Sequence, residues 1–574
     1  MNLFTGLDNI LMIGGGFMED LYVTVTGFAN YYHKKPFAIG NVLICVKEPS
    51  NKYDSEAITV KLPIIGKVGY IANSPASIAG GTLSAGRIYD KVEDKFFVRV
   101  MFTTQSKVIC KVEENSDGIL EKEIQTQIEA AEEWLNDFSK GSIISNILRL
   151  SIPMTLAQLI NVLYSIVDRI YIGRMGENSS LALTGVGVCL PIITIVIAFA
   201  NLIGMGGAPL FSIKRGEGNE KEAEAILGNS VTLLVIFGLC LTVVGLIVKR
   251  PLLYLLGASE NTIEYANSYI TIYLLGNVFV MMSLGLNSFI NAQGFGKTGM
   301  FTVVIGAVLN IILDPIFIYI MGVQGAALAT VLSQLAASVW TFKFLTGKNT
   351  IIKIKLSAMR CQAKRVKKIL VLGLSGFTMS VTNSAVQIAC NVSLQNYGSD
   401  VYVGVMTIIN SIREVLQMPV TGLGNGAQPI IGFNYGAGEN GRVKEAIRYL
   451  AAMLIIYSTV AWFIILLIPK FLIGIFTADA ALITAGVPSL HIYFFGFFLM
   501  AFMFTGQTVF VGIGKAKFAI FFSILRKGIV VIPLILLLPI WFGVNGVFLA
   551  EPISNLIGGL ACFTTMYFAV YRKL

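Results

Sequence analysis

Two polar side chains stand in the apolar stretch Leu309-Asn310-Ile311-Ile312-Leu313-Asp314-Pro315. Asn310 and Asp314 are four residues apart, so on a helix they share one face. Pro315 cannot donate a backbone hydrogen bond, which frees a carbonyl oxygen near the carboxylate. A carboxylate inside a membrane helix costs at least roughly 2.5–3.5 kcal/mol, and such residues usually face a cavity and handle ions or protons. The pair is therefore a candidate ion or proton site, and a structural Asp paired with another helix is the alternative.

The composition indicates that these residues belong to a membrane protein. The chain has 574 residues, of which 55% are hydrophobic and 13% charged, whereas a soluble protein has about 25% charged residues. Seven cysteines without CxxC spacing and only two histidines argue against a Cys/His zinc site. The composition predicts a polytopic membrane protein. Because no nucleophile or metal constellation stands out in the sequence, we predict that it is not an enzyme and needs no cofactor.

The net charge of +10 is unevenly placed along the chain. Residues 1–112 carry 12 Lys/Arg and 9 Asp/Glu, residues 113–140 carry 2 and 9, and residues 141–574 carry 29 and 15. The basic excess therefore belongs to the membrane part, where it sets the topology, and gives no support for nucleic-acid binding.

Twelve apolar segments after residue 142 are long enough for a membrane span, which needs about 20 residues. They cover 143–172, 182–213, 227–248, 266–292, 299–321, 325–345, 369–395, 401–434, 447–468, 484–511, 518–540 and 545–571. With the N-terminus inside, the inside loops and the C-terminal tail hold 19 Lys/Arg and the outside loops hold 4. The positive-inside rule then places both termini in the cytoplasm. No basic residue precedes His33 and Lys34, so we expect no cleavable signal peptide.

The membrane part contains an internal duplication. Its landmark pairs, 218 to 221 residues apart, are Pro209/Pro429, Gly216/Gly436, Gly218/Gly438, Gly276/Gly496, Gly296/Gly514 and Gly322/Gly543. Because six is an even number, two copies of six helices enter the membrane in the same direction. Two like halves around a midplane site are a transporter architecture that permits alternating access.

Three motifs resemble the MATE (multidrug and toxic compound extrusion) family. They are Val167-Asp168-Arg169-Ile170-Tyr171-Ile172-Gly173, the stretch from Asn310 to Pro315, and Gly426-Ala427-Gln428-Pro429-Ile430-Ile431-Gly432-Phe433-Asn434-Tyr435-Gly436, which is close to the bacterial MepA-like branch. The resemblance covers residues 143–574. It implies twelve helices in two bundles, antiport of drugs and organic cations against H+ or Na+, and an ion site of Asp168, Asn310 and Asp314. A prokaryotic inner membrane and a monomeric transporter are expected.

Either coupling ion suits these residues. A buried carboxylate can carry a proton, and two carboxylates close together titrate as a pair. The carboxylates and the Asn310 amide also supply the hard oxygen ligands that cations take. The sequence does not distinguish H+ from Na+.

Candidate substrate contacts lie in the second half. The resemblance implies that Glu414 is a substrate-site acid, and Met418, four residues on, shares its helix face. An acid attracts a drug cation, and Met lines a site for varied shapes; the alternative is that Glu414 balances a nearby cation. Other branches carry an acid in the seventh helix, where this chain has Gln387 and Asn391, so a sodium site of that type is not expected. These two amides complete the predicted substrate site.

The pattern of residues 1–112 predicts a small soluble β-rich domain. A partly open barrel is one architecture that fits it. Short β-like runs cover 21–26, 40–46, 57–62, 67–71 and 96–102. Glu48-Pro49-Ser50-Asn51-Lys52-Tyr53-Asp54-Ser55-Glu56-Ala57-Ile58-Thr59-Val60, followed by Gly69-Tyr70-Ile71, resembles the HIRAN domain. That resemblance implies that Tyr31 or Tyr32, Tyr53 and Asp54 contact a single-stranded nucleic-acid end. The alternative is that Tyr53 and Asp54 form a structural turn and that the domain binds a partner or nothing.

The predicted order is thus a HIRAN-like domain (1–112), an acidic helical linker (113–142), an N-terminal six-helix half (143–345), a basic cytoplasmic connector (346–369) and a C-terminal half (370–574). The leading functional hypothesis is an ion-coupled multidrug exporter. A lipid or lipid-linked-sugar flippase on a similar scaffold is the alternative, and it would require a cavity rich in Arg and Lys for phosphate groups. The cavity charges identified from the sequence are mostly acidic, which disfavours it. Arg526-Lys527 either extend to the membrane surface or pair with an acid.

Overall fold

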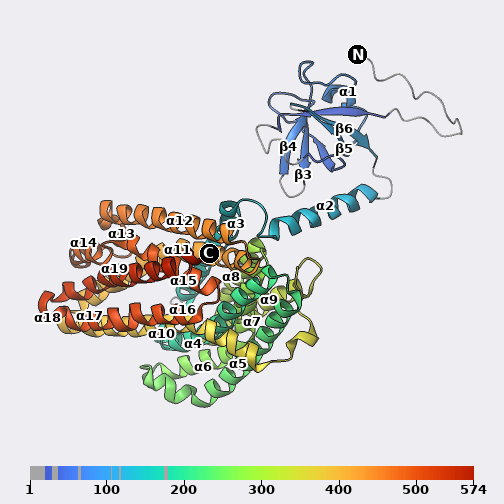
Figure 1. The fold of residues 1–574 in the computed structure, drawn as a ribbon. Coiled ribbons are helices and arrows are strands. Elements are labelled where there is room, and N and C mark those ends of the chain that lie inside the picture. The colour runs from blue at the N-terminus through green and yellow to red at the C-terminus, as the bar shows by residue number, and fades with distance from the viewer. Residues whose placement is uncertain (1–19, 29–36, 63–65, 105, 115–117, 173–178) are drawn as a thin grey trace. The chain divides into compact units, whose positions relative to one another are not determined.

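The computed structural model describes residues 20–28, 37–62, 66–104, 106–114, 118–172 and 179–574. The chain forms two compact units, Met1–Trp134 and Leu135–Leu574 (Figure 1). The first unit contains a short helix, α1 (Ala85–Tyr89), and a longer one, α2 (Ile119–Asn136). Its strands are β1 (Tyr22–Thr26), β2 (Val42–Lys47), β3 (Ile58–Leu62), β4 (Gly66–Ile71), β5 (Lys95–Thr103) and β6 (Val108–Glu113).

The six antiparallel strands close into a barrel in the order β1-β4-β3-β2-β5-β6. Alternate side chains point inward, and the core includes Val23, Val25, Leu43, Val60 and Val98. Each predicted β-like run lies on a strand, and β6 completes the set. The barrel is closed rather than partly open, because β1 pairs with both β4 and β6.

Helix α2 is anchored to the barrel through its first turns. Leu120 and Ile124 pack with Val42 and Phe97 in a small apolar cluster. Arg99 of β5 donates hydrogen bonds to Glu113 and Glu123 at 2.6–2.8 Å. The compact unit therefore extends past the predicted boundary at 112, and these turns of α2 are docked rather than part of a solvated linker.

The second unit is built from helices in the described residues, and its halves are joined by 347–362. The first half holds α3 (Ile143–Ile172), α4 (Ser179–Gly216), α5 (Glu220–Leu255), α6 (Ile263–Leu275), α7 (Asn277–Ala292), α8 (Gly296–Met321) and α9 (Val323–Thr346). The short helix η3 (Leu356–Met359) lies in the connection. The second half holds α10 (Ala363–Tyr397), α11 (Asp400–Gly436), α12 (Asn440–Leu467), α13 (Pro469–Gly474), α14 (Ala480–Tyr493), η4 (Phe497–Leu499), α15 (Met500–Gly512), α16 (Ala516–Ile524), the π-helical turn η5 (Leu525–Val531), α17 (Ile532–Leu537), α18 (Pro539–Phe542), α19 (Val544–Ala569) and η6 (Tyr571–Lys573).

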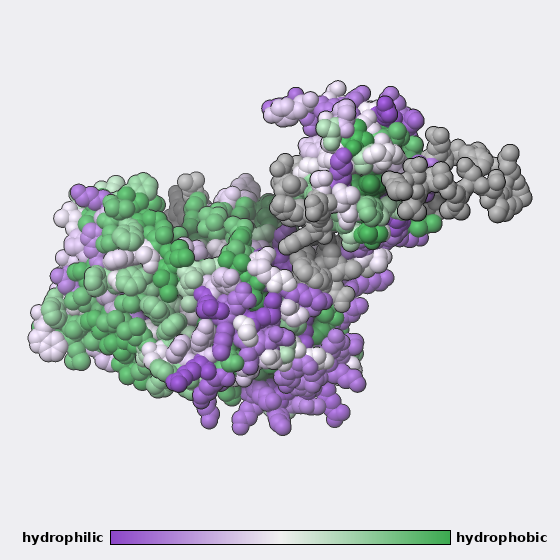
Figure 2. Space-filling view, turned by 45° about the horizontal axis from the view of Figure 1, so that its top comes forward, coloured by the Kyte–Doolittle hydropathy of each residue, from purple (hydrophilic) through white to green (hydrophobic). Residues whose placement is uncertain are grey.

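Helices cover all twelve predicted apolar segments. Among the described residues, nine are long and apolar enough to cross a membrane, and up to eleven if each of two bent pairs forms one span. Helix α11 falls outside this set, because Asn410, Arg413 and Glu414 interrupt its apolar sequence. Large apolar side chains are exposed on the helical unit, and Figure 2 shows a broad hydrophobic surface there. The unit is a multi-pass membrane protein, and twelve spans stays a prediction.

The backbone repeats as the landmark pairs predict. Gly276 separates α6 from α7 at a bend of 56°, and Gly496 lies in the break between α14 and α15, where the bend is 42°. Gly322 and Gly543 end their helices with φ of 62° and 55°, conformations that favour glycine. One predicted pairing shifts: Gly514, with φ of 74°, corresponds to Gly294, with φ of 101°, and not to Gly296.

The two halves pack through α3 with α11 and α4 with α10, and their backbones also approach closely where α4 and α11 end. A methyl group on Gly216 would overlap the carbonyl oxygen of Phe433, and one on Gly436 would overlap that of Ile213. Phe433 and Ile213 are themselves 220 residues apart, so the two contacts are equivalent by the repeat. Glycine at both positions allows the helix backbones to approach closely.

Residues 136–141, which join α2 to α3, lie against both halves. Arg215, at the end of α4, donates to the carbonyl oxygen of Asn136 at 2.6 Å. Arg442 of α12 donates to the carbonyl oxygens of Phe138, Lys140 and Gly141 at 2.9–3.2 Å. Phe138 is fully buried, and its ring packs on that of Phe433. These six residues thus bridge the halves at the end where α4 and α11 meet.

Candidate functional site

The predicted pair in α8 is buried and internally bonded. Asn310 and Asp314 are 2% and 0% exposed, and Asn310 Nδ2 donates to Asp314 Oδ1 at 3.0 Å. The four-residue spacing on one helix face produces this contact. Two further oxygens, Asn310 Oδ1 and Asp314 Oδ2, are buried and accept no hydrogen bond from the described residues. Buried acceptors without donors are costly, and a proton or a metal cation would satisfy them.

Neighbouring helices complete this N-half site. Asn310 Nδ2 also lies 3.5 Å from Thr330 Oγ1 of α9. Asp168 of α3 is half-buried and interacts electrostatically with Asp314 and with Tyr269 of α6. The site thus draws residues from four helices. It can share a proton between two carboxylates or place hard oxygens around a small cation.

Thr330 and Tyr269 were absent from the predicted site. Neither stands out in the sequence, because hydroxyl residues are common on helices and both lie outside the α8 motif. Only the packing of α9 against α8, and of α6 against α9, brings them near it. Within the described residues, no group of three or more His, Cys, Asp or Glu side chains could hold a metal ion.

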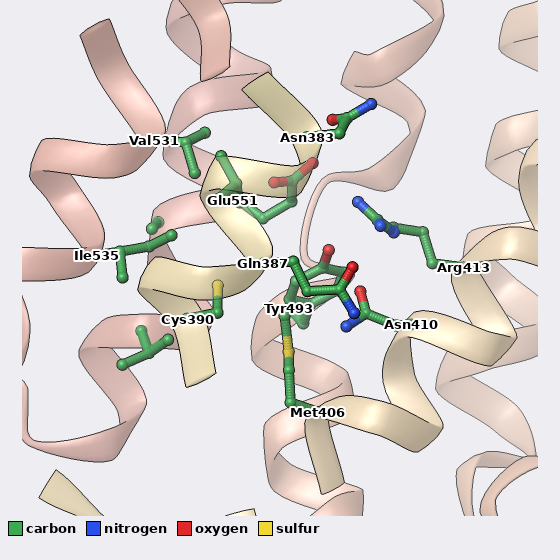
Figure 3. A pocket seen from close by; sticks show the side chains of 13 residues that line it. Asn383, Gln387, Cys390, Met406, Asn410, Arg413, Tyr493, Val531, Ile535 and Glu551 are labelled. Carbon is green, nitrogen blue, oxygen red and sulfur yellow. The ribbon is translucent and has the colours of Figure 1, made fainter. Parts of the chain in front are cut away.

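The C-terminal half contains a small cavity of about 20 Å³, which has room for about one water molecule (Figure 3). Of the four predicted substrate residues, Gln387 lines it. Met418 is buried elsewhere in α11, and Glu414 and Asn391 are exposed on α11 and α10, outside this lining. The other polar lining residues are Asn383, Asn410, Arg413, Tyr493 and Glu551.

A buried ion cluster borders this cavity. Glu551 of α19 accepts a hydrogen bond from Arg526 at 2.7 Å and two from Lys527 at 3.0 and 3.1 Å. Arg526 also donates to Asn555 at 2.9 Å. All three ionic side chains are at most 8% exposed. Arg526 and Lys527 therefore pair with an acid, the second of the two predicted alternatives, and the expectation of mostly acidic cavities does not hold in this half.

The predicted ligand residues of the barrel differ in what the structure shows. Tyr31 and Tyr32 lie outside the described residues. Tyr53 is 98% exposed. Asp54 accepts hydrogen bonds from the backbone of Glu56 and from the side chain of Asn73, both at 3.0 Å. Both carboxylate oxygens of Asp54 are thus engaged in shaping the loop between β2 and β3.

Comparison with known proteins places these features in a family. The family model described as MatE matches residues 153–316 and 376–537, which is one match in each half. The chain belongs to the MatE family. A multidrug export protein MepA from Staphylococcus saprophyticus is 27% identical over 440 residues, which cover 76% of this chain and 96% of the relative. MepA from Staphylococcus aureus is 25% identical with the same coverage.

Solved structures agree on the fold. A multidrug resistance MATE transporter in an outward-facing conformation superimposes with a TM-score of 0.71 at 24% identity. A MATE structure in a bent conformation gives 0.72 at 24% identity. Both alignments cover 76% of this chain, and 99% and 98% of the solved chains. MATE proteins are transporters and not enzymes, so this chain is a MATE transporter of the MepA-like type with an additional N-terminal unit.

Proposed function

We propose that the chain is a secondary active multidrug exporter that expels cationic, amphipathic compounds in exchange for H+ or Na+. Twelve helices in two bundles would form the transport path, with both termini in the cytoplasm and one chain as the working unit. The MepA relatives, which are multidrug export proteins by name, support the substrate class.

One observation carries the coupling role, namely the two buried oxygens of Asn310 and Asp314 that accept no hydrogen bond from the described residues. A coupling ion bound there would satisfy both atoms. Without the ion, the two buried oxygens would lack a donor or a cation. This cost favours a different packing of α8 against α3 and α9. Ion release and helix movement would thereby be linked.

The test is ethidium efflux from proteoliposomes, driven first by a proton gradient alone and then by a sodium gradient alone. Efflux with protons only would make Asp168 and Asp314 a proton site, and efflux with sodium only would make them a cation site with Asn310. The Asp314→Asn variant keeps the shape of the side chain and the bond to Asn310. We expect it to fold normally and to lose gradient-driven efflux at least tenfold.

Exposed Asp479→Asn, at the start of α14, is the matched control and should transport at the normal rate. Normal gradient-driven efflux by Asp314→Asn would refute the coupling role. No efflux by the unaltered protein under either gradient would favour a lipid or lipid-linked-sugar flippase. That second candidate gains support from Arg413, which lines the C-half cavity and suits a phosphate group. Arg526 and Lys527 lie behind it, paired with the lining residue Glu551.

For the N-terminal unit we propose a partner-binding role. Residues 1–134 carry 13 Lys/Arg and 17 Asp/Glu, a net charge of −4. Because nucleic-acid affinity depends on neutralising phosphates, this balance favours a protein partner over a nucleic acid. Salt-dependent binding of single-stranded DNA to the full chain, abolished by Tyr53→Ala, would reverse this preference.

A further inference from the structure

The C-half cavity occupies the position that the ion site has in the N-half. Glycines 322 and 543 end equivalent helices and set an offset of 221 residues. By this offset Asn310, Asp314 and Thr330 correspond to Val531, Ile535 and Glu551, and all three of these line the C-half cavity. The repeat has therefore produced two internal sites, and the coupling residues of the first are apolar in the second.

The charge of the second site is reversed. Three cations, Arg413, Arg526 and Lys527, interact electrostatically with the single acid Glu551. Glu414 follows Arg413 but is exposed and does not line the cavity. Arg526 and Lys527 are held on Glu551 by hydrogen bonds. Arg413 interacts electrostatically with Glu551 and Glu414 but donates a hydrogen bond to no carboxylate among the described residues. With Glu414 counted as well, three cations face two acids, and the local balance is positive by one charge.

One hydrogen-bond donor in the cavity lining and one in the neighbouring ion cluster also lack acceptors among the described residues. The Nε atoms of Arg413 and Arg526 are buried and find no partner among the described residues. In Figure 3, Arg413 and Asn410 extend from α11 toward Gln387 of α10 and Glu551 of α19. A buried guanidinium with a free N–H and amide groups beside it is suited to an oxyanion, because charge-assisted bonds to such groups are the strong ones.

Two of these cations lie in a helical turn of uncommon geometry. Arg526 and Lys527 lie in the π-helical turn η5, a form that is rare and frequent at functional sites. The wider turn places two consecutive residues so that both reach Glu551. One cation would neutralise this acid, and burying a second cation that has to share the same carboxylate costs several kcal/mol.

We propose that the C-half cavity binds an oxyanion group of the transported molecule, with Arg413 as its direct partner and the Arg526–Lys527–Glu551 cluster as its positive surroundings. This rests on the proposed export function and refines its substrates to amphipathic compounds that carry a carboxylate or phosphate as well as an amine. The carboxylate of a drug and the phosphate of a lipid share this chemistry.

The experiment measures equilibrium binding to the full chain in detergent, without any ion gradient. The probes are a rhodamine with a free carboxylate and the methyl ester of the same dye, which differ only in the anionic group. We expect the acid to bind at least tenfold more tightly than the ester. Arg413→Gln should weaken binding of the acid roughly tenfold to a hundredfold, the loss expected for one hydrogen bond to a charged group, and leave the ester unchanged.

Two variants keep the result interpretable. Arg413→Lys retains the charge and should recover part of the affinity for the acid, whereas exposed Arg448→Gln in α12 should change neither probe. Competition with short-chain phosphatidate and with the matching diacylglycerol separates the sources. Displacement by phosphatidate alone assigns the site to lipid phosphate, and absence of displacement assigns it to a drug carboxylate.

Equal affinity for acid and ester, with no effect of Arg413→Gln on either, would overturn the oxyanion site. Because binding is measured without a gradient, this result is independent of ion coupling. Failure of gradient-driven efflux would instead affect only the proposed function.

Discussion

Glu551 is the acid of the buried ion cluster in the C-half, and we expect the stability of this half to depend on it. It is the hydrogen-bonded acid for both Arg526 and Lys527 in a region that is almost fully buried. Breaking a buried ion pair by removing one partner is far more costly than never having the pair, because an uncompensated charge remains inside.

Glu551→Gln should therefore lower the free energy of unfolding by about 3–5 kcal/mol. The measurement is thermal unfolding of the purified protein in detergent, with exposed Glu439→Gln as the control. The double variant Glu551→Gln with Lys527→Met removes one of the stranded charges and should recover part of the loss. An unfolding temperature within a degree of the unaltered protein would contradict the structural role of this acid.

At the same scale, the sequence predicts contacts between side chains that are close together on one helix. The Asn310–Asp314 bond follows from four-residue spacing on one helix, so the sequence alone predicts it. The pairing of Glu551 with Arg526 and Lys527 joins helices about 25 residues apart, and no spacing rule selects that acid. The sequence places Arg413 next to Glu414 but does not show that its side chain lines the cavity, which only the packing of α11 on its neighbours determines.

Among the elements, the ends of α4 and α11 form one close backbone contact between the halves. Gly436→Ala would place a methyl group against the carbonyl oxygen of Ile213, which belongs to rigid helix backbone. Overpacking of this kind costs roughly 1–3 kcal/mol, so we expect a lower unfolding temperature and looser contact between the halves. Cross-linking of cysteines placed at 217 and 437 would report the separation.

Gly441→Ala in α12 is the matched control, because a methyl group there meets no atom within 4 Å. Unchanged stability and cross-linking in Gly436→Ala would show that the helix ends move apart at no cost. That outcome would remove these glycines from any account of how the halves separate.

Helix α2 and the barrel form a second pair of elements with a measurable link. The hydrogen bonds from Arg99 lower the pKa of Glu123, so the pair stabilises the folded unit when Glu123 is charged. This contribution is present above the ordinary Glu pKa of about 4.3 and is lost as the pH falls through the lowered value.

Glu123→Gln should destabilise the unit by about 0.5–1 kcal/mol near pH 7, because the pair is partly exposed, and should make no difference at low pH. Urea unfolding of a fragment covering 1–134 at several pH values measures this. The partly exposed Glu121, which lies 3.9 Å from Lys95, provides the control Glu121→Gln with a smaller effect. A constant difference at every pH would exclude Glu123 as the titrating group.

The sequence predicts the helices well where the apolar pattern is continuous or where a glycine recurs in both halves. Each predicted apolar segment carries helix, and glycine pairs mark the same breaks in both halves. Two features escaped it, namely the closure of the barrel and the docking of α2. Both depend on contacts between residues distant in sequence, such as Val42 and Phe97 with Leu120, which periodicity does not encode.

For the whole molecule, the two compact units separate the proposed roles. The candidate ion site, the C-half cavity and the contacts between the halves all lie within residues 135–574. A chain shortened to these residues should therefore retain ethidium efflux within about twofold of the full chain, measured in proteoliposomes at equal protein content. Loss of efflux despite normal folding would mean that residues 1–134 take part in every transport cycle.

The residues just before α3 carry a mechanical consequence. Asn136, which ends α2, accepts a hydrogen bond from Arg215 of α4, and Phe138, Lys140 and Gly141 accept hydrogen bonds from Arg442 of α12. A force that the preceding chain exerts at Asn136 is therefore shared between the two halves. We expect such a force to change how readily the halves separate.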